Sequence, residues 1–370
     1  MYKFKNRLKG LVLSAAALSC AVALTACGAG ASAAAGTKNQ NADGAESSQK
    51  LQVVATIFPE YDWVKEILGD QADNVDLTLL LGNGTDMHSF QPTMADILKV
   101  STCDVFIYVG GESDAWVADV LKGAGNPDRR AINLMEVLGD QAKEEEVVEG
   151  MQDEDGHTHV EADDHGTVTD GENAANADIE ADAADDHSQD DDLEYDEHVW
   201  LSLRNASLFC DTIAEALGEA DPDNAQLYQR NADAYEEKLA ALDEEYQAAV
   251  EQSQTKTVLF ADRFPFRYLV DDYNLSYYAA FTGCSAETDA SFETITFLAG
   301  KLDELKLPVV LTIENSDQKV AKAVIENTKT KDQKILPLNS MQSVTTKEVE
   351  EGTTYLSIME NNLQILKEAL

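Results

Sequence analysis

Residues 221–251 read DPDNAQLYQRNADAYEEKLAALDEEYQAAVE. Asp221 is a favourable residue at a helix N-terminus, and Pro222 fits the first helical position. A helical pattern then follows at steps of three or four, through Leu227, Asn231, Tyr235, Leu239, Leu242, Tyr246 and Val250. The pattern predicts one helix of roughly thirty residues, which at about 1.5 Å per residue spans about 45 Å. We expect a rigid strut between two lobes.

Apolar, β-branched runs alternate with helical patterns on both sides of this helix. The runs lie at 53–58, 75–81 and 105–109 before it, and at 257–261, 276–281, 308–313 and 335–338 after it. Helical patterns at 291–304 and 317–327 separate the later runs. This alternation predicts an α/β protein with parallel sheets. The predicted division is an N-terminal lobe over 51–220, a linking helix over 221–252 and a C-terminal lobe over 253–370.

The chain of 370 residues is strongly acidic, with 69 Asp and Glu against 27 Lys and Arg and a formal net charge of −42. Such a surface repels nucleic acid and anionic lipid, so cations are the expected partners. The segment 144–197 holds 23 acidic residues and no Lys or Arg. It has few large apolar side chains, and we expect it to be disordered when unliganded.

Four of the six histidines lie in this acidic segment, at His157, His159, His165 and His187. Imidazole interleaved with carboxylate is a cation-collecting composition, which predicts weak auxiliary metal sites. The alternative is a solvating linker in which the histidines are incidental.

The N-terminus has the pattern of a targeting segment. Basic residues within 1–10 precede an apolar run over 11–24, and Leu24-Thr25-Ala26-Cys27 follows. The run is short for a membrane span and is typical of a secretory signal, although a retained anchor helix is the alternative. The four residues Leu24-Thr25-Ala26-Cys27 resemble the lipobox of bacterial lipoproteins, which implies lipidation at Cys27. We therefore predict a signal peptide over 1–27, a flexible tether over 28–50 and an extracytoplasmic location at the outer face of the cell membrane.

Three cysteines remain after Cys20 and Cys27, namely Cys103, Cys210 and Cys284. They lack the short paired spacing of a thiolate metal site, and each has apolar neighbours in the sequence. We predict small buried side chains, with one disulfide as the alternative.

The two remaining histidines have different surroundings. His88 lies in GNGTDMHSFQP at 82–92, directly after a predicted strand, and Thr93 with Asp96 forms a capping box for the next helix. His198 lies in DEHVW at 196–200, where the acidic segment ends. Each histidine alone is compatible with a surface or packed side chain.

Several motifs in order carry a family resemblance. They are Gly-x-Asp-x-His-x-Phe-x-Pro-Thr at 84–93, DVFIYVG at 104–110, Trp116, DEHVWLSLRNA at 196–206 and GTTYLSIMENNL at 352–363. Together with the long helix and the acidic histidine-containing segment, they resemble the zinc and manganese substrate-binding lipoproteins of ABC importers, the ZnuA-like or TroA-like group. The resemblance covers about 51–370.

This resemblance implies two doubly wound four-strand lobes, a rigid helix between them, and a metal in the interlobe cleft held by four side chains, two from each lobe. His88 and His198 fall on the first two ligand positions. Asp262 falls on the third, where the family commonly has His or Glu. The nearest match to the fourth is Gln342, with Glu314 as the alternative.

Topology supports these positions, because ligands of open α/β sheets gather beyond the carboxyl ends of strands. His88, Asp262, Glu314 and Gln342 each follow the end of a predicted strand. Structural roles remain open for three of them. Asp262 could form a salt bridge with Arg263 or Arg267, Gln342 could hydrogen-bond buried backbone, and Glu314 could cap the next helix.

The predicted function is capture of Zn²⁺ and delivery to the permease and ATPase of an ABC importer, by a monomer. Two imidazoles with oxygen ligands suit zinc, whereas Mn²⁺ accepts the same set with more oxygen. A manganese-binding protein of the same fold and a surface adhesin are the alternatives. We do not expect an enzyme, since the sequence has no His-Glu-x-x-His, Gly-x-Ser-x-Gly, phosphate loop or dinucleotide fingerprint.

Overall fold

The computed structural model describes residues 50–123, 125–152, 194–285 and 289–370. The first of its two sheets is entirely parallel, with the strand order β2-β1-β3-β4. Its strands are β1 (Leu51–Ala55), β2 (Val75–Leu79), β3 (Val105–Tyr108) and β4 (Arg130–Asn133). The helices of this lobe are α1 (Phe58–Leu68), α2 (Met94–Thr102), α3 (Ala115–Lys122) and α4 (Leu134–Leu138). Thr93 and Asp96 form the predicted capping box at the start of α2.

The second sheet is also parallel, with the order β6-β5-β7-β8. Its strands are β5 (Thr257–Phe264), β6 (Ser276–Thr282), β7 (Val309–Ile313) and β8 (Lys334–Leu338). The helices of this lobe are α7 (Arg267–Asp272), α8 (Phe292–Leu305), α9 (Lys319–Glu326), α10 (Thr346–Glu350) and α11 (Tyr355–Ala369). Two four-stranded parallel sheets with flanking helices confirm the predicted α/β fold class.

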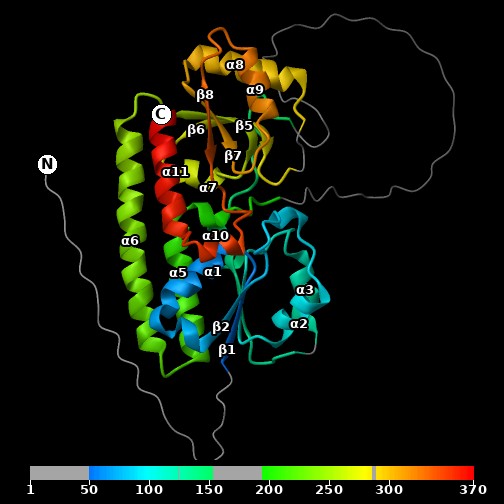
Figure 1. The fold of residues 1–370 in the computed structure, drawn as a ribbon, viewed down its shortest axis with the longest axis vertical. Coiled ribbons are helices and arrows are strands. Elements are labelled where there is room, and N and C mark those ends of the chain that lie inside the picture. Colours follow the sequence, from blue (N-terminus) through cyan, green and yellow to red (C-terminus); the bar gives the residue numbers. More distant parts are fainter. Residues whose placement is uncertain (1–49, 124, 153–193, 286–288) are drawn as a thin grey trace, which may run out of the picture. The chain divides into compact units, whose positions relative to one another are not determined.

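Two further helices, α5 (Leu203–Ala220) and α6 (Ala225–Gln252), connect the sheets along the chain. Figure 1 shows α6 passing helices of both lobes. Near its start, the Asn231 side chain donates to the Ile67 carbonyl of α1. Near its end, the Tyr246 hydroxyl donates to the Met359 carbonyl of α11. The long helix is thus tied to the N-terminal lobe at one end and to the C-terminal lobe at the other.

The start of α6 differs from the sequence prediction. The helix begins at Ala225 rather than at Asp221, which is the C-cap residue of α5. The Asp221 carboxylate accepts hydrogen bonds from the side chains of Asn224 and Tyr228. These bonds close a turn between α5 and α6, and the turn takes up the residues that the pattern assigned to the first helical turn.

The ends of the acidic segment are ordered, which corrects the prediction of disorder over 144–197. Glu144 pairs with Tyr195 in an antiparallel bridge, and Gln152 pairs in parallel with Phe281 of β6. Met151 is fully buried in the core. The short apolar stretch around Met151 therefore packs against the C-terminal lobe. His157, His159, His165 and His187 lie outside the described residues.

The predicted signal peptide, Cys27 and positions 28–49 of the predicted tether also lie outside the described residues. Within the part of the chain that the structure describes, no helix combines the length and the apolar character that crossing a bilayer requires. Cys103 and Cys210 are buried and free, as the prediction of small core side chains requires, and none of the three cysteines described forms a disulfide.

A buried carboxyl in the N-terminal lobe predicts an unusual pH dependence of stability. Glu60 is fully buried in α1, and its Oε2 accepts from the Thr56 and Ile57 amides. Burial, followed by the charge of Asp114, raises the pKa of Glu60 to about 8. The folded state therefore binds this proton more tightly than the unfolded state does. That contribution to stability is present at low pH and is lost as the pH rises from about 4.5 to about 8, by at most about 1.4 kcal/mol per pH unit.

Urea unfolding of the wild type and Glu60→Gln at a series of pH values measures this effect. We expect the fall in unfolding free energy between pH 4.5 and 8 to be shallower in Glu60→Gln, which has no proton to lose. Asp114, whose pKa burial raises to about 7, acts in the same direction and remains in both proteins. Parallel curves for the two proteins would show that Glu60 is ionised throughout.

Candidate metal centre

Two histidines of the N-terminal lobe are held at the start of short 3-10 turns. His88 belongs to the turn Met87–Ser89 beyond β2, and its amide donates to the Asp86 carboxylate over 3.1 Å. His198 precedes the turn Val199–Leu201, is fully buried, and donates its amide to Asp196 over 2.8 Å. In both places an aspartate two residues earlier fixes the backbone of the histidine.

The outer ring nitrogen of each histidine has an oxygen partner. His198 Nδ1 lies 3.0 Å from Asp196 Oδ1. His88 Nδ1 lies 2.9 Å from Ser113 Oγ and 3.7 Å from Glu197 Oε2. A carboxylate oxygen only accepts, so the contact with Asp196 favours a proton on His198 Nδ1 and leaves a free lone pair on its Nε2. The Ser113 hydroxyl can accept from His88 Nδ1 in the same way, and the negative charge of Glu197 favours a proton there. Carboxylate–histidine pairs of this kind orient the histidine ligands of metal sites.

The inner ring nitrogens converge on one point. His88 Nε2 and His198 Nε2 are 3.2 Å apart. The amide of Gln342 lies 3.4 Å from His88 Nε2 and also contacts His198 Nε2. Two imidazole lone pairs at this separation repel one another unless a donor or a cation lies between them. The structure thus brings together His88, His198 and Gln342, three of the residues that the sequence predicted.

Gln342 is carried by a loop that the surrounding residues hold firmly. The Glu314 carboxylate accepts from the Ser340 amide over 2.7 Å and from its hydroxyl over 2.9 Å. The Trp200 indole donates to the Ser340 carbonyl over 2.8 Å. Met341 adopts a left-handed backbone conformation with φ of 64°, which non-glycine residues adopt mainly where the surrounding structure imposes it.

Glu314 therefore supports the Gln342 loop. Its carboxylate is engaged with Ser340 instead of capping α9, whose N-cap residue is Gln318 and has no side-chain cap. The alternative role of Glu314 as a helix cap is wrong. As a metal ligand it stays a prediction that these contacts do not favour.

Asp262 is placed apart from the two histidines. It lies where the pairing of β5 with β6 shifts register, between Phe260 and Arg263. Its carboxylate accepts from the Arg263 amide and from the Ser316 hydroxyl. The Arg263 guanidinium pairs with Asp86 over 2.7 Å instead. Because β5 extends to Phe264, Asp262 lies within the strand rather than after its end as predicted. The register shift there changes where its side chain points, so the carboxylate does not join the histidine pair.

We predict that Asp262→Asn leaves zinc affinity unchanged, because the carboxylate is occupied by Ser316 and the Arg263 amide. Gln342→Ala should weaken zinc binding, since the Gln342 amide contacts both imidazoles. Competition of each variant with a zinc chelator of known affinity measures both effects. A marked loss of affinity in Asp262→Asn would return this residue to the ligand set.

Cys284 is the site residue that the sequence reasoning missed. It was predicted to be a small buried side chain, but it is half-buried and free just beyond β6. Among the described His, Cys, Asp and Glu side chains, only His88, His198 and Cys284 form a group of three whose ligand atoms all lie within 4.8 Å of one another. The position of Cys284 after a strand end was the available signal, and its apolar neighbours in the sequence obscured it.

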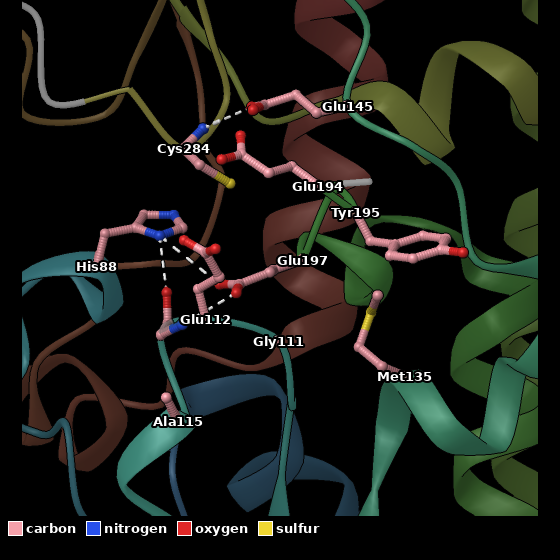
Figure 2. Close-up of a pocket in the computed structure, with 11 residues that line it drawn as sticks. His88, Gly111, Glu112, Ala115, Met135, Glu145, Glu194, Tyr195, Glu197 and Cys284 are labelled. Carbon is pink, nitrogen blue, oxygen red and sulfur yellow. Dashed lines mark hydrogen bonds and ion pairs between the residues drawn. The ribbon is translucent and has the colours of Figure 1, made fainter. Parts of the chain in front are cut away.

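An acidic cavity of about 680 Å³ opens beside this group. Figure 2 shows Cys284 above and the Glu197 carboxylate below the level of the His88 ring. The acidic side chains that line the cavity are Glu112, Glu145, Glu194 and Glu197. Burial, followed by His198, lowers the pKa of His88 to about 3, so its imidazole is neutral at physiological pH. A neutral imidazole beside carboxylates favours a divalent cation.

Comparison with known proteins identifies the family. A family model described as the periplasmic component A of a zinc-uptake complex, ZnuA, matches residues 53–369. The chain belongs to the ZnuA family. The match confirms the resemblance on which the predicted ligand positions rest.

Two curated relatives have similar sequences. The zinc-binding lipoprotein AdcA of Streptococcus pneumoniae is 28% identical over 350 residues, which cover 94% of this chain and 59% of AdcA. The chain thus spans about three fifths of the length of AdcA. The high-affinity zinc uptake system protein ZnuA of Bacillus subtilis is 27% identical over 338 residues, covering 91% of this chain and 93% of that protein.

The fold agrees with that of a solved ZnuA-like domain. The Zn(II)-bound ZnuA-like domain of Streptococcus pneumoniae AdcA superposes with a TM-score of 0.62 at 24% identity. The superposition covers 87% of this chain and 99% of that domain. At this level of identity the likeness establishes the shared architecture of two sheets and flanking helices.

Proposed function

We propose that this chain captures zinc outside the cytoplasm and delivers it to the permease of an ABC importer. The observation that carries the proposal is the convergence of His88 Nε2 and His198 Nε2 at 3.2 Å, with each Nδ1 held by an oxygen. Membership of the ZnuA family supports transport as the purpose of this site. The names of the two curated relatives, one a zinc-binding lipoprotein and the other a zinc uptake protein, support zinc as the cargo.

The donor set favours zinc over manganese. Two imidazoles occupy the centre of the site, and imidazole nitrogen suits Zn²⁺, whereas Mn²⁺ prefers oxygen ligands. Glu314 and Asp262, the two carboxylates predicted as ligands, are engaged with Ser340 and Ser316. The manganese alternative therefore has less support in the contacts than zinc.

The partners follow from the proposed transport. A permease and its ATPase would receive the metal, and lipidation at Cys27 would hold a monomer at the outer face of the cell membrane. Because α6 is tied to both lobes, we expect metal release to involve small changes in ligand geometry rather than wide opening.

The proposed lipid anchor has its own test. Cys27→Ser removes the thiol that would carry the lipid, so it should shift the protein from the membrane fraction to the medium.

Native mass spectrometry of the full chain with equimolar Zn²⁺ and Mn²⁺ tests the proposal. We expect one tightly held zinc ion per chain and no retained manganese. Zinc uptake by cells that carry the gene deletion, compared with the restored wild type, tests delivery. Retention of manganese in preference to zinc, or unchanged zinc uptake on deletion, would contradict the proposed function.

The acidic histidines lead to a separate prediction. His157, His159, His165 and His187 are proposed as weak auxiliary metal ligands that the tight site does not need. Replacing 153–193 with a Gly-Ser linker keeps the ordered ends of the segment, where Glu144 pairs with Tyr195 and Gln152 pairs with Phe281. Isothermal titration should then show loss of the weak sites and retention of one tight zinc. Loss of the tight site would show that the segment supplies a ligand.

A further inference from the structure

We propose that the Cys284 thiolate is the third protein ligand of the metal. The centre would then consist of His88 and His198 from the N-terminal lobe, and Cys284 with the Gln342 amide oxygen from the C-terminal lobe. This inference rests on the proposed function, since it names the ligands of the same site. It replaces the predicted carboxylate of Asp262 with a sulfur ligand.

The distances fit a tetrahedral zinc centre. Zinc bonds of about 2.05 Å to nitrogen and 2.3 Å to sulfur place neighbouring ligand atoms about 3.3 Å apart for two nitrogens and about 3.6 Å apart for nitrogen and sulfur. The two Nε2 atoms are already 3.2 Å apart. All three ligand atoms of the group with Cys284 lie within 4.8 Å of one another. A side-chain movement of about 1 Å completes the geometry.

The backbone next to Cys284 lies close to the His198 ring. A Cβ added at Gly283 would lie 3.0 Å from His198 Cε1 and 3.2 Å from His198 Nδ1. The same Cβ would lie 2.9 Å from the Phe264 carbonyl oxygen, a distance that real Cβ atoms essentially never show. Glycine at this position therefore lets the strand end pack directly against the imidazole. Gly283 thus sets the short distance between the sulfur and the buried histidine.

Contacts on both sides of Cys284 hold it there. Its amide donates to Glu145 Oε1 over 3.1 Å. On the far side, the Arg263 guanidinium contacts the Ser285 carbonyl and pairs with Asp86, the residue that also fixes the His88 amide. One arginine thus links the backbone that carries Cys284 to the turn that carries His88. Such outer contacts position metal ligands.

The fourth position is filled by reorienting Gln342. Its amide nitrogen faces both histidines, and rotation of the amide by half a turn puts Oε1 in the same place. When zinc enters, a zinc–sulfur bond forms, the S–H bond of Cys284 breaks, and its proton passes to solvent. A site with one thiolate and two imidazoles discriminates against Mn²⁺, which prefers oxygen.

Zinc X-ray absorption spectroscopy of the full chain with one equivalent of zinc tests the proposal. We expect a sulfur shell at about 2.3 Å beside the nitrogen and oxygen shell. Cys284→Ser should lose the sulfur shell and weaken zinc binding by more than the roughly 10- to 100-fold that outer-shell changes cause. Cys103→Ala is the matched control, because Cys103 is buried in the N-terminal lobe away from the site. This variant should keep the sulfur shell and the zinc affinity of the wild type.

The outcomes separate this inference from the proposed function. A tight zinc surrounded by nitrogen and oxygen alone would overturn the sulfur ligand and leave zinc capture intact. Failure of the wild type to hold zinc at all would overturn zinc capture and, with it, the sulfur ligand. The wild-type spectrum decides the question even if Cys284→Ser does not fold. Mapping alkylation at Cys284 adds a second measurement, in which zinc should protect this thiol, and no protection would count against the proposal.

Discussion

Replacing both His88 and His198 with alanine should abolish the stabilisation of the protein by zinc. A ligand that binds only the folded state stabilises it by about 2.7 kcal/mol when its free concentration is 100 times the dissociation constant. The double variant removes both Nε2 atoms that converge at 3.2 Å, so no pair of imidazoles remains for the metal. Urea unfolding with and without buffered zinc measures the difference.

The matched control is the double variant His157→Ala with His159→Ala. It removes two imidazoles from the acidic segment instead, and it should keep the full stabilisation by buffered zinc. Circular dichroism before unfolding checks that each variant is folded. If His88→Ala with His198→Ala were still stabilised as the wild type is, the tight site would lie elsewhere in the chain.

Trp200→Ala should lower the unfolding free energy by about 3–5 kcal/mol, the range for removing a large aromatic side chain from a core. Trp200 is fully buried, and its ring lies 5.3 Å from that of His198. Its indole also donates to Ser340, in the loop that carries Gln342. We therefore expect weaker zinc binding in the fraction that remains folded.

Trp200→Phe separates packing from the hydrogen bond, because it keeps most of the ring and should cost about 1 kcal/mol for the lost bond. Trp116→Ala is the control for removing a tryptophan. Trp116 is half-buried and packs on Phe90 and Phe106, so its removal should cost less and leave zinc affinity unchanged. Equal losses in Trp116→Ala and Trp200→Ala would contradict the assigned role of Trp200.

Much of the fold follows from the sequence because its signals are local. Long apolar runs such as Val105–Tyr108 and the periodic pattern of α6 are set by neighbouring residues, and both appear in the structure. The sequence did not predict the edge strand β4. Arg130–Asn133 has one buried apolar side chain, Ile132, and is too short for the alternation of apolar and polar residues that predicts a strand.

The site residues that lie in family motifs could be predicted from the sequence. Those whose positions depend on tertiary packing could not. His88, His198 and Gln342 meet as expected. Asp262 does not join them, because a register shift in β5 intervenes. Cys284 reaches the histidines through the close approach of Gly283 to His198, a distance that no local pattern encodes.

A crystal structure of the zinc-loaded protein, with data at the zinc absorption edge, tests the central claim most directly. We predict one strong anomalous peak per chain within bonding distance of both His88 Nε2 and His198 Nε2, at about 2.0–2.1 Å from each. A fully occupied peak elsewhere, with the two imidazoles still in contact with Gln342 alone, would contradict zinc capture at this centre.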